Sequence, residues 1–188
     1  MDQFQIPGGT SGFSAQTAAR QIIVNNDPAL ELAWGSSTFN PSVLVLNDST
    51  AGTTLTLQNK IDIAGATRTI AVNANTATLS GDIRTSSSTA GITKTGAGTL
   101  VLSGSNTYDG PTTISAGTLT IGNVGTFNNT SQIVLLGTSR LEVNAANASL
   151  ARLVTGGGVP FGTFLRYSQA QAAAGVANGP GTIMGTVE

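Results

Sequence analysis

The sequence predicts an all-β protein, specifically a right-handed parallel β-helix (a β-solenoid) with coils of about twenty residues. Three observations support this prediction. Only 9% of the residues are charged although 39% are hydrophobic, and the chain is rich in Thr, Ser, Asn and Gly, which suit strands and turns better than helices. Apolar residues recur as pairs with one residue between them. These pairs return along the chain at a nearly constant step.

The apolar pairs predict short strands that each bury one face, because alternate side chains of a strand point to the same side. The pairs are Leu30/Leu32, Leu44/Leu46, Leu55/Leu57, Ile61/Ile63, Ile70/Val72, Leu100/Leu102, Leu119/Ile121, Ile133/Leu135 and Leu141/Val143. Turn-forming clusters such as 25–28, 47–50 and 103–106 separate them. Short strands with frequent turns fit a solenoid, a barrel or a sandwich, and a β-sandwich remains the alternative.

The spacing of the pairs favours the solenoid. Five apolar positions, Leu57, Leu79, Leu102, Ile121 and Val143, are separated by 22, 23, 19 and 22 residues. In a solenoid each coil buries its inner face on its neighbours, so equivalent positions return once per coil. Outward Thr, Ser and Asn side chains can then form ladders along the stack.

The chain divides into three segments. Residues 1–20 are rich in Gly, Gln, Ser and Thr, which predicts a loosely packed N-terminal arm. Residues 21–150 contain the apolar pairs and are predicted to form the solenoid. Residues 151–188 are predicted to be a C-terminal cap or attachment segment. Within it, the Ala-rich stretch 168–177 predicts a short helix and residues 182–187 predict one last strand.

Composition argues against several functions. The chain has no His and no Cys, so the commonest acid–base and nucleophilic side chains and the thiolate ligands of zinc are missing. Eight basic and nine acidic residues are scattered singly, which disfavours nucleic-acid binding. No apolar run is long enough for a membrane span, and the first residues lack the features of a signal peptide. We therefore expect a protein that is not an enzyme and has no cofactor and no metal site.

Residues 91–122 contain the most distinctive pattern, GITKTGAGTLVLSGSNTYDGPTTISAGTLTIG. Its Gly96 and Gly98 indicate a tight turn or a close approach between coils. Leu100 and Leu102 should point inward from one strand, and Asn106 suits a turn. Tyr108 is expected to bury its ring and keep its hydroxyl in water.

This pattern is similar to the autotransporter-associated β-strand repeat, also called the passenger-associated transport repeat, of bacterial surface proteins. The residues that carry the resemblance are Lys94, Gly96, Gly98, Leu100, Leu102, Asn106, Tyr108, Gly110, Gly117 and Leu119. The resemblance implies a parallel β-helix in an exported passenger, secreted or at the cell surface, whose signal peptide is not in this chain. It also associates the repeat with efficient passenger transport.

We therefore expect a structural or adhesive extracellular segment that associates with itself head to tail or by strand donation; surface glycans or host matrix are the other expected partners. Two alternatives stay open. A carbohydrate-binding module would use exposed aromatic residues, of which Trp34, Tyr108 and Tyr167 are the candidates. A polysaccharide-cleaving β-helix enzyme would use charged residues gathered on one face, for which the candidates are Asp62, Arg68, Asp82 and Arg84.

Overall fold

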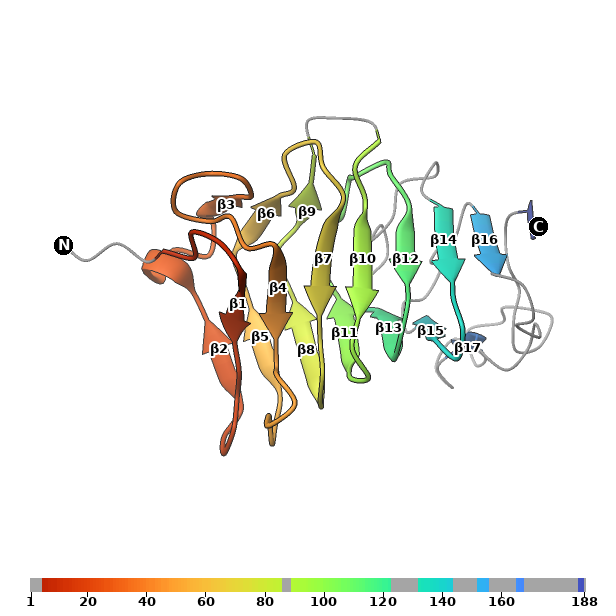
Figure 1. The fold of residues 1–188 in the computed structure, drawn as a ribbon, viewed down its shortest axis with the longest axis horizontal. Coiled ribbons are helices and arrows are strands. Elements are labelled where there is room, and N and C mark those ends of the chain that lie inside the picture. Colours follow the sequence, from red (N-terminus) through yellow and green to blue (C-terminus); the bar gives the residue numbers. More distant parts are fainter. Residues whose placement is uncertain are drawn as a thin grey trace.

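The computed structural model describes residues 5–85, 89–122, 132–143, 152–155, 165–167 and 186–187. In these ranges the chain is built of short β-strands, with one turn of 3₁₀ helix, η1, at Val24–Asn26. Every strand pairing in the described part of the chain is parallel, and the strands stack coil upon coil along the long axis of Figure 1. The predicted parallel β-solenoid is confirmed, and the alternative of a β-sandwich is excluded, because a sandwich is built from antiparallel sheets.

Three sheets form the sides of the stack. The first has the order β1 (Thr10–Phe13), β4 (Val43–Leu46), β7 (Arg68–Ala71), β10 (Ile92–Thr95), β12 (Thr112–Ile114), β14 (Gln132–Leu135), β16 (Arg152–Thr155) and β18 (Thr186–Val187). The second has the order β2 (Arg20–Ile22), β5 (Leu55–Leu57), β8 (Thr76–Leu79), β11 (Thr99–Leu102), β13 (Thr118–Ile121), β15 (Arg140–Val143) and β17 (Leu165–Tyr167). The third has β3 (Glu31–Ala33), β6 (Lys60–Asp62) and β9 (Ile83–Arg84).

The length of a coil depends on whether it contains a strand of the third sheet. Consecutive partners in the first sheet, Thr10, Val43, Thr69, Thr93, Thr113 and Val134, are 33, 26, 24, 20 and 21 residues apart. The first three steps contain β3, β6 and β9, and the described residues of the last two contain no strand of that sheet (Figure 1). In the first sheet, the step is therefore closest to the predicted twenty residues in the coils that begin at β10.

The core is a set of aliphatic ladders inside the stack. The five positions chosen from the sequence, Leu57, Leu79, Leu102, Ile121 and Val143, are register partners in consecutive strands of the second sheet, which confirms the predicted spacing. The side chains of the first four are at most 1% exposed. Because each coil covers the apolar face of the preceding coil, the hydrophobic effect stabilises the stack in the part from Ile6 to Leu141, where the buried side chains are described.

The two ends differ from the expected segment boundaries. Thr10–Phe13 form β1 and pair with β4, so the first coil starts inside the segment predicted to be an arm. At the other end, β16, β17 and β18 extend the sheets into the predicted cap segment. The Ala-rich stretch 168–177 and residues 182–185 of the predicted last strand lie outside the described residues.

Candidate functional site

The repeat forms two consecutive coils, made of β10 with β11 and β12 with β13. Its leucines lie on the inner face: Leu100, Leu102 and Leu119 are fully buried. Thr99 and Val101 alternate with these leucines and are only partly buried. The alternation of β11 therefore places its leucines in the core and its threonine and valine on the outer surface of the second sheet.

The glycines of the repeat stand where neighbouring coils approach closely. Gly96 has a φ of 80° and Gly117 a φ of 68°, in the left-handed region that favours glycine. A Cβ at Gly117 would lie 2.4 Å from the carbonyl oxygen of Gly98, one coil earlier. Side chains at Gly98 and Gly110 would likewise overlap backbone atoms of the preceding coil. Small residues at these corners allow the coils to stack.

Lys94 is the residue whose environment the sequence analysis did not anticipate. It alternates with Thr93 and Thr95, so its side chain points inward, and its exposed fraction is 0%. Its Nζ donates hydrogen bonds to the carbonyl oxygens of Thr95 (2.9 Å), Gly96 (2.7 Å) and Ala116 (3.0 Å). Desolvation lowers the pKa of Lys94 to about 8. The pattern Ile92-x-Lys94 contained the signal, because both residues must lie on the same face of the strand.

Asn106 and Tyr108 occupy the place where the third sheet ends. Asn106 Oδ1 accepts a hydrogen bond from the backbone N–H of Ile83 in β9 (2.8 Å), and Thr107 N–H donates to the Ile83 carbonyl (2.9 Å). The Tyr108 ring is buried, and its hydroxyl also is buried, 2.7 Å from Thr112 Oγ1. The expectation that this hydroxyl lies in water is therefore wrong. Burial raises the pKa of Tyr108 well above its ordinary range.

Two buried asparagines have the same function outside the repeat. Asn47 Oδ1 accepts from the backbone N–H of Ala15 (2.9 Å) and Asn59 Oδ1 accepts from that of Val24 (2.7 Å), each in the preceding coil. The side-chain amide of Asn59 also donates to backbone carbonyls, including that of Asp27 (2.9 Å). These amides satisfy backbone groups at corners where no strand pairing is available.

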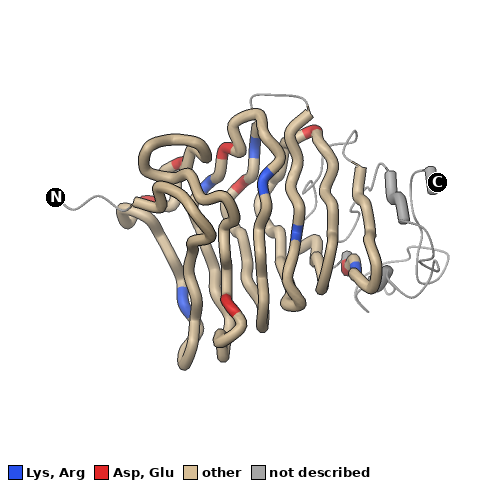
Figure 2. Tube along the Cα trace, viewed as in Figure 1, with Lys and Arg blue, Asp and Glu red and all other residues tan. Residues whose placement is uncertain are grey.

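A group of charged residues lies on or next to the strands of the third sheet, and Figure 2 shows these positions around β3, β6 and β9. Arg84 forms a two-point ion pair with Glu31, with 2.6 Å between Nη2 and Oε1, and it lies 3.9 Å from an oxygen of Asp62. Lys60 and Asp82 are also 3.9 Å apart. The structure thus brings Asp62, Asp82 and Arg84 to one face, as the enzyme alternative supposed.

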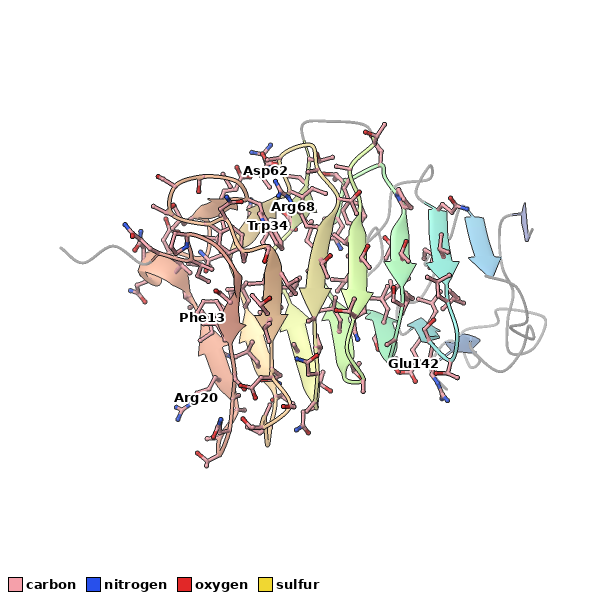
Figure 3. The ribbon with its side chains drawn as sticks, viewed as in Figure 1. Phe13, Arg20, Trp34, Asp62, Arg68 and Glu142 are labelled. Atoms are coloured by element: carbon pink, nitrogen blue, oxygen red, sulfur yellow. The ribbon has the colours of Figure 1, made fainter. Side chains whose placement is uncertain are left out.

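Arg68 makes different contacts at the edge of this face. Its guanidinium lies 5.4 Å from the centre of the Trp34 ring and donates to the carbonyl oxygens of Ile63 (3.0 Å) and Trp34 (3.3 Å). Figure 3 shows Arg68 beside Trp34, with Asp62 nearby. Burial lowers the pKa of Arg68. These contacts attach β7 to the loop after β3 and leave Arg68 outside the ion pairs of the charged face.

The arrangement offers little for chemistry. Among the described residues, no three Asp or Glu side chains are grouped to hold a metal ion. Trp34 and Tyr108 are each 1% exposed, so neither ring can stack on a sugar, and the Tyr167 side chain lies outside the described part. A hollow of about 310 Å³ opens beside β3, lined by residues that include Val24, Leu30, Leu32 and Phe39. Its lining is mainly apolar, and Glu31 is its single ionisable residue.

Comparison with known proteins agrees with this geometry. The family model of the passenger-associated transport repeat matches residues 92–121, which are β10 to β13. The chain is also 34% identical over 178 residues to a protein named adhesin BmaC autotransporter from Brucella suis biovar 1 (strain 1330). The match covers 92% of this chain and 5% of that protein, so the chain spans about one-twentieth of its relative. No solved structure matches the chain. No helix among the described residues is long and apolar enough to cross a membrane.

Proposed function

We propose that this chain, which matches the passenger-associated transport repeat over residues 92–121 and is 34% identical to part of an autotransporter adhesin, is a non-catalytic, adhesive β-solenoid segment of an extracellular passenger. Its coils present long outer faces for contact at the cell surface. The observation that supports this proposal best is the position of the repeat: it forms two ordinary coils of a continuous stack, and its distinctive residues hold those coils together. The relative that spans most of this chain is itself named an adhesin.

The outer faces have the character of a contact surface. In the second sheet, the register partners Thr56, Thr78 and Val101 form an uncharged, partly exposed row across three coils. The charged face of the third sheet consists of ion pairs, which are hydrated and contribute little to stability. Surface glycans or host matrix proteins are the expected partners of such faces.

Adhesion of coated beads tests the proposal. Beads carrying the folded chain are expected to be retained on immobilised matrix proteins or glycans more strongly than albumin-coated beads. Thr99→Asp changes an outward position and serves as the folded control, whereas Leu102→Asp disrupts the core. Retention should persist with Thr99→Asp and disappear with Leu102→Asp. Equal retention of all the beads would contradict an adhesive function.

A second observation favours association of chains head to tail. Among the described residues, the apolar side chains that pack only partly against the core are Phe13, Ile22 and Leu30, and these three belong to the first coil. The outer edges of β1 and β2 are also the ends of their sheets. Open strand edges next to apolar side chains can accept a strand from another molecule. Repeated in one direction, such a contact produces a filament unless it closes into a ring.

Light scattering over a concentration series tests this association. Ile22→Asp introduces a charge at the partly buried end of the core and should keep the chain monomeric. Gln21→Asp, at the neighbouring exposed position, is the matched control and should associate like the unchanged chain. An unchanged chain that stays monomeric at the highest concentration would contradict the proposal.

A further inference from the structure

Lys94 occupies a position in the core that is aliphatic in the neighbouring coils. Its register partners are Ile70 in β7 and Ile114 in β12, and the same ladder continues to Leu44 and Leu135. A buried ammonium group in such a ladder is costly unless all its donors are satisfied. The repeat therefore contains a polar group where an apolar side chain would fit.

The three carbonyl groups that accept hydrogen bonds from Lys94 belong to two different coils. The carbonyl of Thr95, the last residue of β10, and that of Gly96, in the turn that follows, lie in the same coil as the lysine. The third carbonyl, that of Ala116, belongs to the turn that follows β12, one coil later. The ammonium group has three N–H donors, so the set is complete only when the next coil supplies its carbonyl.

Apolar alternation alone does not determine how β12 pairs with β10. A shift by one residue would turn the apolar side chains outward, but a shift by two keeps them inside. After such a shift Ile114 would lie opposite Ile92, which is also a buried aliphatic residue. The carbonyl of Ala116 would then move by about 6.6 Å along the strand, beyond hydrogen-bonding distance from Lys94.

We propose that Lys94 is a register-specifying residue: it selects the pairing of β12 on β10 in which Ala116 completes its hydrogen bonds, and it does so at the expense of stability. The shifted pairing takes the Ala116 carbonyl away from a buried charged donor, whereas an aliphatic residue at position 94 needs no such acceptor in either pairing. A single buried polar group is known to determine register in this way in coiled coils. This inference concerns assembly of the stack and holds whether or not the segment is adhesive.

Disulfide trapping tests the proposal directly, because the chain has no native cysteine. Thr93 and Thr113 are register partners on the outer face, so Thr93→Cys with Thr113→Cys reports the observed pairing. Thr93→Cys with Ser115→Cys reports the pairing shifted by two residues, since cysteines offset in this way in the observed pairing are too far apart to bond. Each pair is placed in the unchanged background, in Lys94→Met and in Lys60→Met, which alters the exposed lysine.

Oxidation of the refolded proteins should give the 93–113 bond alone in the two backgrounds that keep Lys94. These are the unchanged background and Lys60→Met. In Lys94→Met the ratio of the 93–115 bond to the 93–113 bond should rise by about ten-fold or more, with a melting temperature no lower than that of the parent. The proposal is overturned if Lys94→Met forms the 93–113 bond alone. It is equally overturned if Lys94→Met fails to fold, because the lysine would then stabilise the stack instead of selecting its register.

A measurement on the unchanged protein tests the contact itself. The amide nitrogens of Gly96, Ala97 and Gly117 directly follow the three carbonyls that accept from Lys94. Their NMR shifts should therefore change together as Lys94 loses its proton near pH 8. If the Gly117 signal did not follow the other two, the ammonium group would not reach the next coil and the proposal would fail.

Discussion

Single residues in this protein are distinguished by the face of the strand on which they lie. Leu102 and Thr99 are three positions apart in β11, yet Leu102 is fully buried and Thr99 is on the outer side. Lys94 obeys the same alternation, and its inward position forces its charged group to find three backbone carbonyls. The effect of a substitution is therefore determined first by the face and only then by the chemistry of the side chain.

Leu102→Asp should destabilise the protein far more than Thr99→Asp. Loss of the buried leucine costs about 1.5–3 kcal/mol, and an unpaired buried carboxylate adds a further penalty. Thr99→Asp should change the free energy of unfolding by about 0.5 kcal/mol or less, as is usual for surface positions. Urea denaturation of both variants measures the difference. Similar midpoints for the two would mean that the assigned faces of β11 are wrong.

Lys94 should make stability depend on pH in the alkaline range. Below pH 8 the lysine is protonated in the folded and the unfolded states, and the folded state carries the cost of the buried charge. Above pH 8 the folded protein releases this proton before the unfolded chain does. The free energy of unfolding should therefore rise by about 2 kcal/mol between pH 7 and 9.5. Above pH 10, the raised pKa of Tyr108 should make stability fall again, because the unfolded chain ionises first.

Urea denaturation at several pH values measures this dependence. Lys94→Met should not show the rise between pH 7 and 9.5, while Lys60→Met should keep it. A rise of the same size in Lys94→Met would assign the effect to another group.

At the scale of the element, the corners between strands tolerate fewer residue types than the strands do. Strands such as β11 and β13 tolerate any inward aliphatic residue of suitable size. The corners need a glycine where coils touch, or an asparagine that satisfies free backbone groups, as Asn47 and Asn59 do. Asn106 has this function at the end of the third sheet, where it occupies the edge of β9.

Substitution of two glycines should separate backbone strain from overlap between coils. Gly117 and Gly137 both have a positive φ, of 68° and 58°. A Cβ at Gly137 would have no atom within 4 Å, whereas one at Gly117 would meet the Gly98 carbonyl. Gly137→Ala should therefore cost about 1–2 kcal/mol from its conformation alone, and Gly117→Ala clearly more. Thermal unfolding of both variants tests this. Equal losses would mean that the coils do not touch at Gly117.

At the scale of the whole molecule, the stack has one apolar core and a very uneven distribution of charge. The charged residues of the third sheet are used in ion pairs with each other, and the large first and second sheets present mainly Thr and Val outside. Each coil contacts only its neighbours, so stability should be nearly a sum over coils and their contacts. Such a molecule is suited to extension and contact more than to enclosing a substrate.

We expect no hydrolase or lyase activity on common polysaccharides. The carboxylates brought together on the third sheet, Asp62 and Asp82, lie beside the cations Arg84 and Lys60. General acid–base cleavage of a glycan needs two carboxylates held at a controlled separation around the bond. Reducing-end or unsaturated-product assays on a polysaccharide panel check this. Turnover that disappears in Asp62→Asn or Asp82→Asn would contradict it.

The sequence by itself determined the class of fold, the inner faces and the repeat. Alternation assigned Leu100 and Leu102 to the core, and the step between apolar positions identified one ladder through five coils. These features are local or periodic, so they can be recognised without knowledge of distant contacts. The residues of the repeat were recognisable in the same way.

Only the tertiary structure decided which distant groups meet. The third sheet and its end at β9, the burial of the Tyr108 hydroxyl, and the ion pair between Arg84 and Glu31, 53 positions apart, depend on how successive coils align. The same is true of Lys94: alternation places it inside, but its third acceptor comes from the next coil. Alternation along a strand determines the side to which a side chain points. The stacking of coils determines which groups that side chain contacts.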